Sequence, residues 1–344
     1  MWPFSKEEKR AEITIKDLVA LLNPRDSRSG VSVDQDSAQG LTAVFSAVNF
    51  IAKQVASYPL KSDNQFINQL VNESPDAVIT ANQWKLSTML NLLLSGNAYC
   101  RINWNRSGYP KSLEFLQSNR VTPVIEQYQL KGYFVDGKAT LLKNIVHFRI
   151  NSIDSMTGRS PIAVCRDAIG LGIAQQNQAA DQQANGMKPS GVIEYPEFLN
   201  SDRGKKFKSS LNERKAGETL VLEGGSQFKA VSMSNADAEF LESRLFSVDE
   251  VARIFNLDKI WLQNSGTGAK YDEVNASQKS LLANTISPYL IAIESELSLK
   301  LMDSIKFNLA ELQRLDAKTR YDVYATAKEL GVLTVDDIKQ REAI

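Results

Sequence analysis

The sequence contains little of the chemistry that metal proteins and many enzymes use. Its 344 residues include one histidine, His147, and two cysteines, Cys100 and Cys165, which lie far apart. A Cys/His zinc site needs about four such ligands and a disulfide framework needs several cysteines, so both are excluded. The low cysteine content fits assembly in a reducing compartment such as the cytosol. His147 lies in an alternating strand pattern, which favours a structural side chain over a base or a ligand.

An excess of basic residues is also missing. Lysine plus arginine equals aspartate plus glutamate at 40 each. A protein that holds duplex DNA tightly neutralises phosphates with such an excess. If this chain meets DNA, we therefore expect weak or brief binding.

Long apolar runs are the third absence. Residues 1–10 carry charges where a signal peptide needs an apolar run, and no later segment stays apolar for about 18 residues. We therefore expect neither export nor a membrane span. The composition, 43% hydrophobic and 23% charged, is typical of a folded globular protein, and the length allows more than one core.

Catalytic and nucleotide motifs are not found. The sequence offers no Ser/His/Asp set and no nucleophile elbow, so no cofactor and no catalytic residue is predicted. Gly266 to Lys270 resembles part of a phosphate-binding loop, but Tyr271 stands where a Walker A motif needs serine or threonine. A plain surface loop and a loop that faces a channel both remain open.

The sequence is organised around residues 234–304, which read as helix, loop and helix. Ser234 and Asp237 form a helix start signal, and apolar residues then recur every three or four positions: Leu241, Leu245, Val248, Ala252 and Phe255. A second apolar stripe begins near residue 274 and contains Pro288, which predicts a kinked helix. The intervening loop is polar and rich in small residues: Asn264, Ser265, Gly266, Thr267, Gly268, Ala269 and Lys270.

The N-terminal part reads as one α+β domain behind a mobile arm at 1–40. Apolar spacing predicts helices at 41–58 and 82–95, the second ended by Gly96. Alternation predicts one sheet with strands at 98–104, 113–115, 128–135, 138–142 and 145–150. Asp136 and Gly137 form a hairpin turn signal between two of these strands.

A long helix is predicted from Ser160 and Pro161, a cap and a first-turn proline, to Gly186. Its first half carries an apolar stripe, whereas its second half is polar on every side with almost no charge. A helix of that kind is not held by its own core, so we expect it to project and pack against copies of itself. The candidate inter-subunit residues are Gln175, Gln176, Gln178, Gln182 and Gln183.

Residues 188–233 form a small α+β insert, with strands at 191–195, 219–223 and 228–233 and a helix at 198–214. So few residues rarely bury enough surface to fold alone, which suggests support from neighbouring subunits. The helix carries a basic cluster that is either a solvated face or a docking surface: Lys205, Lys206, Lys208, Arg214 and Lys215. After the insert and the helix–loop–helix region, a helix at 319–330 ended by Gly331 and a last helix started by Thr334 complete the chain.

The order of these pieces resembles the portal proteins of tailed bacteriophages, of the compact type found in long-tailed siphophages. The resemblance spans about residues 31–340 and rests on short motifs whose order and spacing are together specific. The motifs are Ala-Val-Phe-Ser-Ala-Val at 43–48, Ser-Tyr-Pro-Leu at 57–60, Gly-Asn-Ala-Tyr at 96–99, Ile-Val-His-Phe-Arg at 145–149, Thr-Gly-Arg-Ser-Pro-Ile at 157–162, Asn-Gly-Met-Lys-Pro-Ser-Gly-Val at 185–192 and Val-Ala-Arg-Ile-Phe at 251–255.

The resemblance implies a multi-part α+β fold. Its parts would be an N-terminal arm at 1–40, an α+β wing at 41–157, a stem helix at 158–187, a small α+β clip at 188–236, a second stem helix at 237–256, a tunnel loop at 257–273, a long kinked helix at 274–304 and a short helical crown at 305–344. In this reading the loop residues from Asn264 to Lys270 face DNA, and the basic cluster of the insert lies on the clip.

The resemblance further implies a non-enzymatic, dodecameric ring at one capsid vertex of a virion assembled in the host cytoplasm. Its partners would be the major capsid or scaffold protein, the large subunit of terminase, then a head–tail adaptor, and double-stranded DNA that passes through without sequence recognition. No membrane is involved. Another head–tail ring, an adaptor or stopper, is the alternative, although adaptors are usually smaller and lack a two-part stem around an insert. A DNA-processing enzyme would need a carboxylate cluster or a nucleotide loop.

Overall fold

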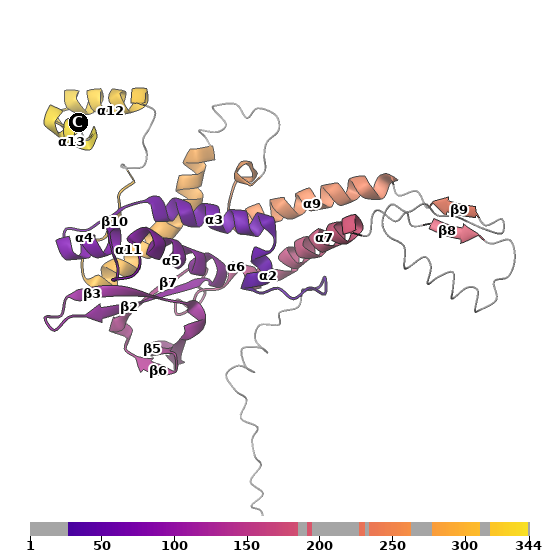
Figure 1. The fold of residues 1–344 in the computed structure, drawn as a ribbon. Coiled ribbons are helices and arrows are strands. Elements are labelled where there is room, and N and C mark those ends of the chain that lie inside the picture. Colours follow the sequence, from indigo (N-terminus) through magenta and orange to yellow (C-terminus); the bar gives the residue numbers. More distant parts are fainter. Residues whose placement is uncertain are drawn as a thin grey trace, which may run out of the picture. The chain divides into compact units, whose positions relative to one another are not determined.

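The computed structural model describes residues 27–184, 191–194, 227–230, 234–262, 277–309 and 317–342 (Figure 1). It divides into two compact units. One, the helical unit, comprises residues 1–47 and 161–273, and the other, the sheet unit, comprises residues 48–160 and 274–344. The boundary falls within helix α3 (Thr42–Ser57), whose apolar side is fully buried at Val44, Val48, Ile51 and Val55.

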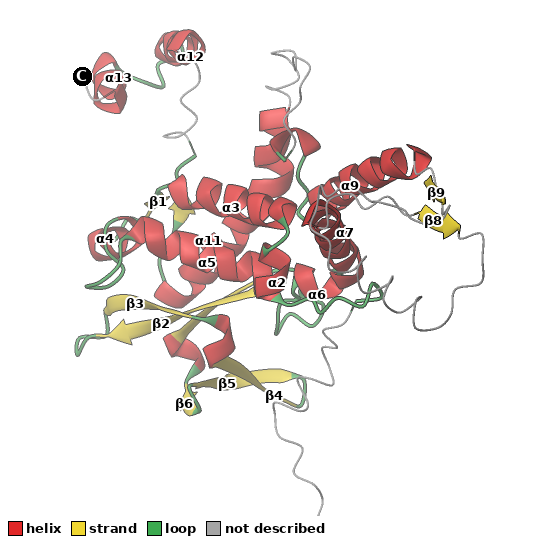
Figure 2. Ribbon diagram, turned by 45° about the vertical axis from the view of Figure 1, so that its right-hand side comes forward, coloured by secondary structure: helices red, strands yellow, loops and turns green. Residues whose placement is uncertain are grey.

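The sheet unit is built on an antiparallel sheet with strand order β3, β2, β7. Its strands are β2 (Asn97–Trp104), β3 (Pro110–Leu116) and β7 (Ile145–Arg149). Helix α5 (Ala81–Ser95) lies against β2 and helix α11 (Ser287–Leu301) against β7, both on the same side of the sheet (Figure 2). Gly96 ends α5 in the left-handed conformation, at φ 76°, as its position in the sequence predicts.

A second antiparallel sheet, β4 (Val121–Glu126), β5 (Gln129–Val135) and β6 (Lys138–Thr140), lies on the other side of the first (Figure 2). Asp136 and Gly137, at φ 50° and 76°, make the predicted hairpin turn between β5 and β6. A shared core joins the two sheets: Tyr99, Leu116, Val121, Tyr133, Val135 and Ile145. Strand β2 is therefore buried on both faces, with Tyr99 toward the second sheet and Cys100 toward Trp84 of α5.

The remaining elements of the sheet unit are short. They are β1 (Leu60–Lys61), which pairs with β10 (Lys306–Phe307), α4 (Gln65–Asn72), the 3-10 turns η1 (Ser118–Arg120) and η2 (Leu142–Asn144), and the helices α12 (Ala317–Glu329) and α13 (Val335–Glu342). Gly331 follows α12 at φ 68°, and the Thr334 hydroxyl oxygen accepts from the backbone N–H of Asp337 at 3.2 Å, so both predicted signals hold.

The helical unit contains α2 (Gln35–Gln39), α6 (Pro161–Val164), α7 (Arg166–Ala184), α9 (Ser234–Ile254) and the 3-10 turn η3 (Lys259–Trp261). Two short strands, β8 (Gly191–Glu194) and β9 (Gln227–Ala230), pair antiparallel. They confirm that the first and last predicted strands of the insert exist. The predicted helix at 198–214 and strand at 219–223 lie outside the described residues. No described helix is long and apolar enough to cross a membrane.

Several predictions of element structure were wrong. The strands form two sheets where a single sheet was predicted, and strand β4 was missed. Pro123 weakens the strand signal of β4, but β4 is an edge strand, where proline is tolerated. The single helix from residue 160 is α6 and α7, separated at Cys165, although the Cys165 N–H still donates to the Pro161 carbonyl at 2.9 Å. The prediction of a mobile arm at 1–40 is wrong for residues 27–40, which include α2. Leu245, which the sequence places on the apolar stripe of α9, is 50% exposed.

The helix around Pro288 is irregular, as predicted, but the irregularity has a specific form. The segment η4 (Leu281–Ile286) is π-helical and leads directly into α11. At this junction the backbone N–H and the hydroxyl of Ser287 both reach the carbonyl of Leu282, five residues back, and the hydroxyl distance is 2.8 Å. A wider turn just before Pro288 accommodates the ring that an ideal α-helix excludes.

Candidate functional site

The helices α7 and α9 form a pair within one chain, and a buried amide joins them. Gln175 on α7 is only 8% exposed. Its side-chain N–H donates to the Ser243 hydroxyl, and the Ser247 hydroxyl donates to its carbonyl oxygen at 2.5 Å. Two serines one turn apart on α9 thus satisfy both ends of a glutamine that would otherwise be costly to bury.

The segment before α3 lies along α7, where two glycines let it approach. A β-carbon at Gly170 would lie 2.2 Å from the hydroxyl oxygen of Ser27, and one at Gly172 would lie 2.9 Å from a methyl carbon of Leu41. The backbone N–H of Arg28 donates to Asp167 at 3.0 Å. The absence of side chains at two positions of α7 therefore makes room for residues 27–41.

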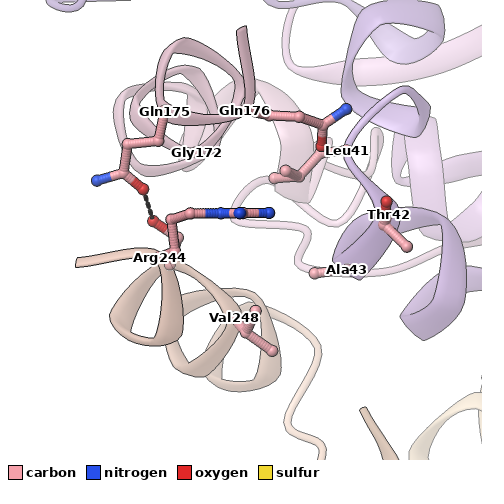
Figure 3. Close-up of a pocket in the computed structure, with 9 residues that line it drawn as sticks. Leu41, Thr42, Ala43, Gly172, Gln175, Gln176, Arg244 and Val248 are labelled. Atoms are coloured by element: carbon pink, nitrogen blue, oxygen red, sulfur yellow. Dashed lines mark hydrogen bonds between the residues drawn. The ribbon is translucent and has the colours of Figure 1, made fainter. Parts of the chain in front are cut away.

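A hollow of about 90 Å³ lies between α7, α9 and the start of α3 (Figure 3). Its walls are Leu41, Thr42, Ala43, Gly172, Gln175, Gln176, Arg244, Ser247 and Val248. Gln176 donates from its side-chain nitrogen to the Gly40 carbonyl at 3.2 Å. Arg244 extends from α9 across the hollow toward the start of α3 (Figure 3).

The structure places only part of the predicted site. Gln175 lies inward against α9, whereas Gln176 and Gln178 are exposed on α7. Gln182 and Gln183 lie in the last turn of α7, where only the backbone is described. The other candidates lie outside the described residues: Asn264, Ser265, Gly266, Thr267, Gly268 and Lys270 of the loop, and Lys205, Lys206, Lys208, Arg214 and Lys215 of the insert.

A second polar cluster, in the sheet unit, is centred on the single histidine. Fully buried His147 on β7 lies between Tyr133, whose hydroxyl is 3.1 Å from Nδ1, and Asn97, whose side-chain oxygen is 2.9 Å from Nε2. The Gly158 N–H donates to that same Asn97 oxygen at 2.7 Å, while the Asn97 amide nitrogen donates to the Gly158 carbonyl at 2.9 Å. The oxygen of Asn97 must accept from Nε2–H, so Nδ1 accepts from Tyr133.

This cluster joins three of the short motifs that are far apart in the sequence. The motifs at 96–99, 145–149 and 157–162 contribute Asn97, His147 and Gly158 respectively. The edge of β7 is held as well: Glu296 of α11 accepts from Arg149 at 3.1 Å and from the backbone N–H of His147 at 3.4 Å. The motifs thus form one structural joint of the sheet unit.

The protonation states in the sheet unit fit a structural role. Burial and the nearby Arg149 and Lys300 cations lower the pKa of His147 to about 3, so the ring is neutral at physiological pH. Burial raises the pKa of the Cys100 thiol to about 12, which keeps it from acting as a thiolate nucleophile. Among the described residues, no three His, Cys, Asp or Glu side chains are grouped so as to hold a metal ion.

Sequence reasoning missed Arg244 and the partners of Gln175. Arg244 lies between Ser243 and Leu245 on α9 and belongs to no recognisable motif. The serines at 243 and 247 do carry a signal, since their spacing places both hydroxyls on one helix face. Which helix they face depends on tertiary packing, which helical spacing does not reveal.

A family model described as "Phage portal protein" matches residues 42–342. The chain belongs to this family, whose members are structural and not enzymes.

Individual relatives agree with the family match. The chain is 24% identical to the "Probable portal protein" of Streptomyces phage phiC31, over 91% of this chain and 77% of that protein. It is 24% identical to the "Portal protein" of Enterobacteria phage HK97, over 90% and 80% of the two chains. Its fold is similar to a chain in the neck of a native gene transfer agent particle computed with C12 symmetry, at a TM-score of 0.61 and 22% identity, over 94% and 96%.

Proposed function

We propose that this chain assembles into a ring at one vertex of a phage or gene transfer agent capsid and forms the channel through which DNA is packaged and ejected. The observation that carries the proposal is the family match over residues 42–342, which leaves out little of the chain. The similar chain in a particle neck with C12 symmetry supports a twelve-subunit ring. The exposed amides of Gln176 and Gln178 on α7 support packing between neighbouring subunits.

The channel is proposed to guide DNA without holding it. Each phosphate paired with a fixed cation adds salt-dependent affinity, and many such pairs would stop a duplex that must move in both directions. The residues at 264–268 are polar or small and carry no charge. Lys270 is the only cation from 264 to 270, so it would contact the DNA backbone transiently.

The region at 188–236, which contains the insert, is proposed as the clip, which meets terminase during packaging and a head–tail adaptor afterwards. Its basic cluster, residues 205–215, would supply the charge for docking. The α+β part at 41–157 is proposed as the wing, which faces the major capsid or scaffold protein. These assignments follow the order of parts in the family.

The test is negative-stain electron microscopy of the purified chain at micromolar concentration, with mass measured by light scattering. Closed rings with a central hole are expected, and Lys270→Ala should give the same rings because its side chain contacts DNA and not a neighbouring subunit. A preparation that stays monomeric under conditions in which the chain is folded would contradict the proposal. Failure of Lys270→Ala alone to form rings would contradict only the placement of the loop.

A further inference from the structure

Arg244 lies at the edge of the hollow and has no counterion among the residues that the structure describes. Within the described part of the chain, its guanidinium makes no ion pair and no hydrogen bond, although other arginines there have carboxylate partners, such as Arg149 with Glu296. The residue is exposed, so a group from outside the chain can reach it. An arginine offers five donors in a planar fork, which suits a carboxylate.

Most other polar side chains in the walls of the hollow already have hydrogen-bond partners within the chain. The amide of Gln175 is bonded to Ser243 and Ser247, and that of Gln176 is bonded to the Gly40 carbonyl. The start of α3 adds a positive potential, because the first backbone N–H groups of a helix have no acceptor within it and Leu41, just before α3, has no side-chain oxygen to cap them. Arg244 and the start of α3 therefore both favour a negative group.

The size of the hollow restricts what can enter. A cavity of about 150 Å³ holds benzene, so about 90 Å³ suits the end of one side chain. The sugar-phosphate backbone of a duplex is too bulky to enter, although it could pass over the exposed guanidinium. Leu41, Ala43 and Val248 line the hollow with apolar surface, which fits the methylene groups of an aspartate or glutamate.

We infer that this hollow receives the carboxylate of an aspartate or glutamate from a neighbouring copy of the chain, and that Arg244 is the cation of this contact between subunits. The inference rests on the proposed ring. It agrees with the exposed side chain of Gln176, which lies in the wall of the same hollow. It agrees also with the balance of 40 basic and 40 acidic residues, which allows unpaired charges in one copy to be satisfied by another.

The first test reverses the charge. Arg244→Glu should raise the protein concentration at half assembly by about tenfold or more, because attraction becomes repulsion at every interface. Arg106→Glu, on an exposed loop of the sheet unit, makes the same change of charge and should assemble as the wild type does. Thermal unfolding of dissociated subunits should be the same for both variants and the wild type.

The second test identifies the carboxylate. In Arg244→Lys rings, a zero-length carbodiimide should join the new amine to an acidic side chain of the next subunit, giving a covalent dimer that mass spectrometry assigns. The wild type lacks an amine at this position and should not give that cross-linked peptide.

The outcomes separate the inference from the proposed function. A wild type that forms no rings would overturn both. Wild-type rings together with unaltered assembly of Arg244→Glu would overturn the inference alone. Arg244→Glu rings that assemble normally but lose packaged DNA would assign the guanidinium to the DNA backbone, which also overturns the inference. A cross-link from position 244 only to its own chain would do the same.

Discussion

A β-carbon at Gly158 would lie 1.9 Å from the carbonyl oxygen of Gly96. The two glycines are 62 positions apart in the sequence, and their close approach lets the Asn97 side chain bond the backbone of Gly158 in both directions. The conformation of Gly96 has φ 76°, which also favours glycine. At Gly158 a side chain is excluded by lack of space, because the atoms that it would meet belong to the backbone.

We predict that Gly158→Ala lowers the free energy of unfolding by about 3 kcal/mol, because the methyl group must displace main-chain atoms. Gly108→Ala is the control: Gly108 has φ 81° and nothing within 4 Å, so that substitution should cost only about 1 kcal/mol of backbone strain. Thermal unfolding of the three proteins measures the difference. Equal losses for the two variants would show that the loop around Gly158 shifts freely.

The buried histidine predicts a dependence of stability on pH. Because its pKa is about 3 in the folded protein and about 6.5 in the unfolded chain, the unfolded chain takes up this proton first as the pH falls. The contribution of His147 to stability is therefore complete above pH 6.5 and is lost progressively as the pH falls toward 3, by up to about 1.4 kcal/mol per pH unit.

Urea unfolding from pH 7 to pH 4.5 measures this slope, and His147→Gln should flatten it while lowering stability at pH 7. Because the chain has a single histidine, a sample labelled with carbon-13 only at the Cε1 atom of histidine gives one nuclear magnetic resonance signal from a ring. That signal should not titrate between pH 8 and pH 4.5 in the folded protein. A midpoint near pH 6.5 would contradict the burial of His147.

The ion pair between Arg149 and Glu296 is predicted to matter more than exposed pairs. Glu296 is 10% exposed at its side chain and Arg149 26%, and Glu296 also accepts from the backbone of β7. We expect Glu296→Gln to cost about 2 kcal/mol, below the value for a fully buried pair because water still reaches Arg149.

Glu114→Gln, which breaks the pair of Arg101 with Glu114 at side-chain exposures of 32% and 36%, is the matched control in the same sheet. Its expected cost is at most about 0.5 kcal/mol. Chemical denaturation at low and at high salt measures the loss of stability in both variants. Added salt should reduce only the smaller loss, that of Glu114→Gln. Two equal costs would mean that α11 is not held to β7 by Glu296.

Local features of the fold could be predicted from the sequence, because they depend on neighbouring residues. Gly96 after α5 and Asp136 with Gly137 between β5 and β6 adopt the left-handed conformations that their residue types favour. Strand β4 was missed because Pro123 argues against a central strand, and an edge position is visible only once the sheet is assembled.

Tertiary partners could not be predicted in the same way. The polar half of α7 predicted a helix that its own core does not hold, but Gln175 is buried against α9, since Ser243 and Ser247 supply its hydrogen bonds. The motifs containing Asn97, His147 and Gly158 could be recognised as a set, yet their common location depends on strand pairing and on a loop that returns to the sheet.

The basic cluster of the insert gives a prediction about docking. Reversing Lys205, Lys206 and Lys208 to glutamate together should leave the ring intact and weaken its binding to the large subunit of terminase, because a complementary acidic surface would be repelled. Binding of purified terminase to wild-type and variant rings at two salt concentrations measures the effect. Unchanged binding and unchanged packaging yield would assign the cluster to a solvated helix face.

Gln175 is buried and Gln178 is exposed on α7, so substitutions at these two positions distinguish an effect on the folding of one subunit from an effect on ring assembly. Gln175→Ala removes a buried amide that bonds two partly buried serine hydroxyls on α9, so it should cost about 1–2 kcal/mol and speed amide hydrogen exchange in both helices of a dissociated subunit. Gln178→Ala changes an exposed side chain and should alter subunit stability by less than about 0.5 kcal/mol. The dissociation of assembled rings should show the opposite order of effects. Gln178→Ala rings should release subunits at a lower denaturant concentration than the stability of the dissociated variant subunit predicts. If Gln178→Ala rings dissociate as the wild type does, α7 is held by α9 alone, and the contacts between subunits must lie elsewhere.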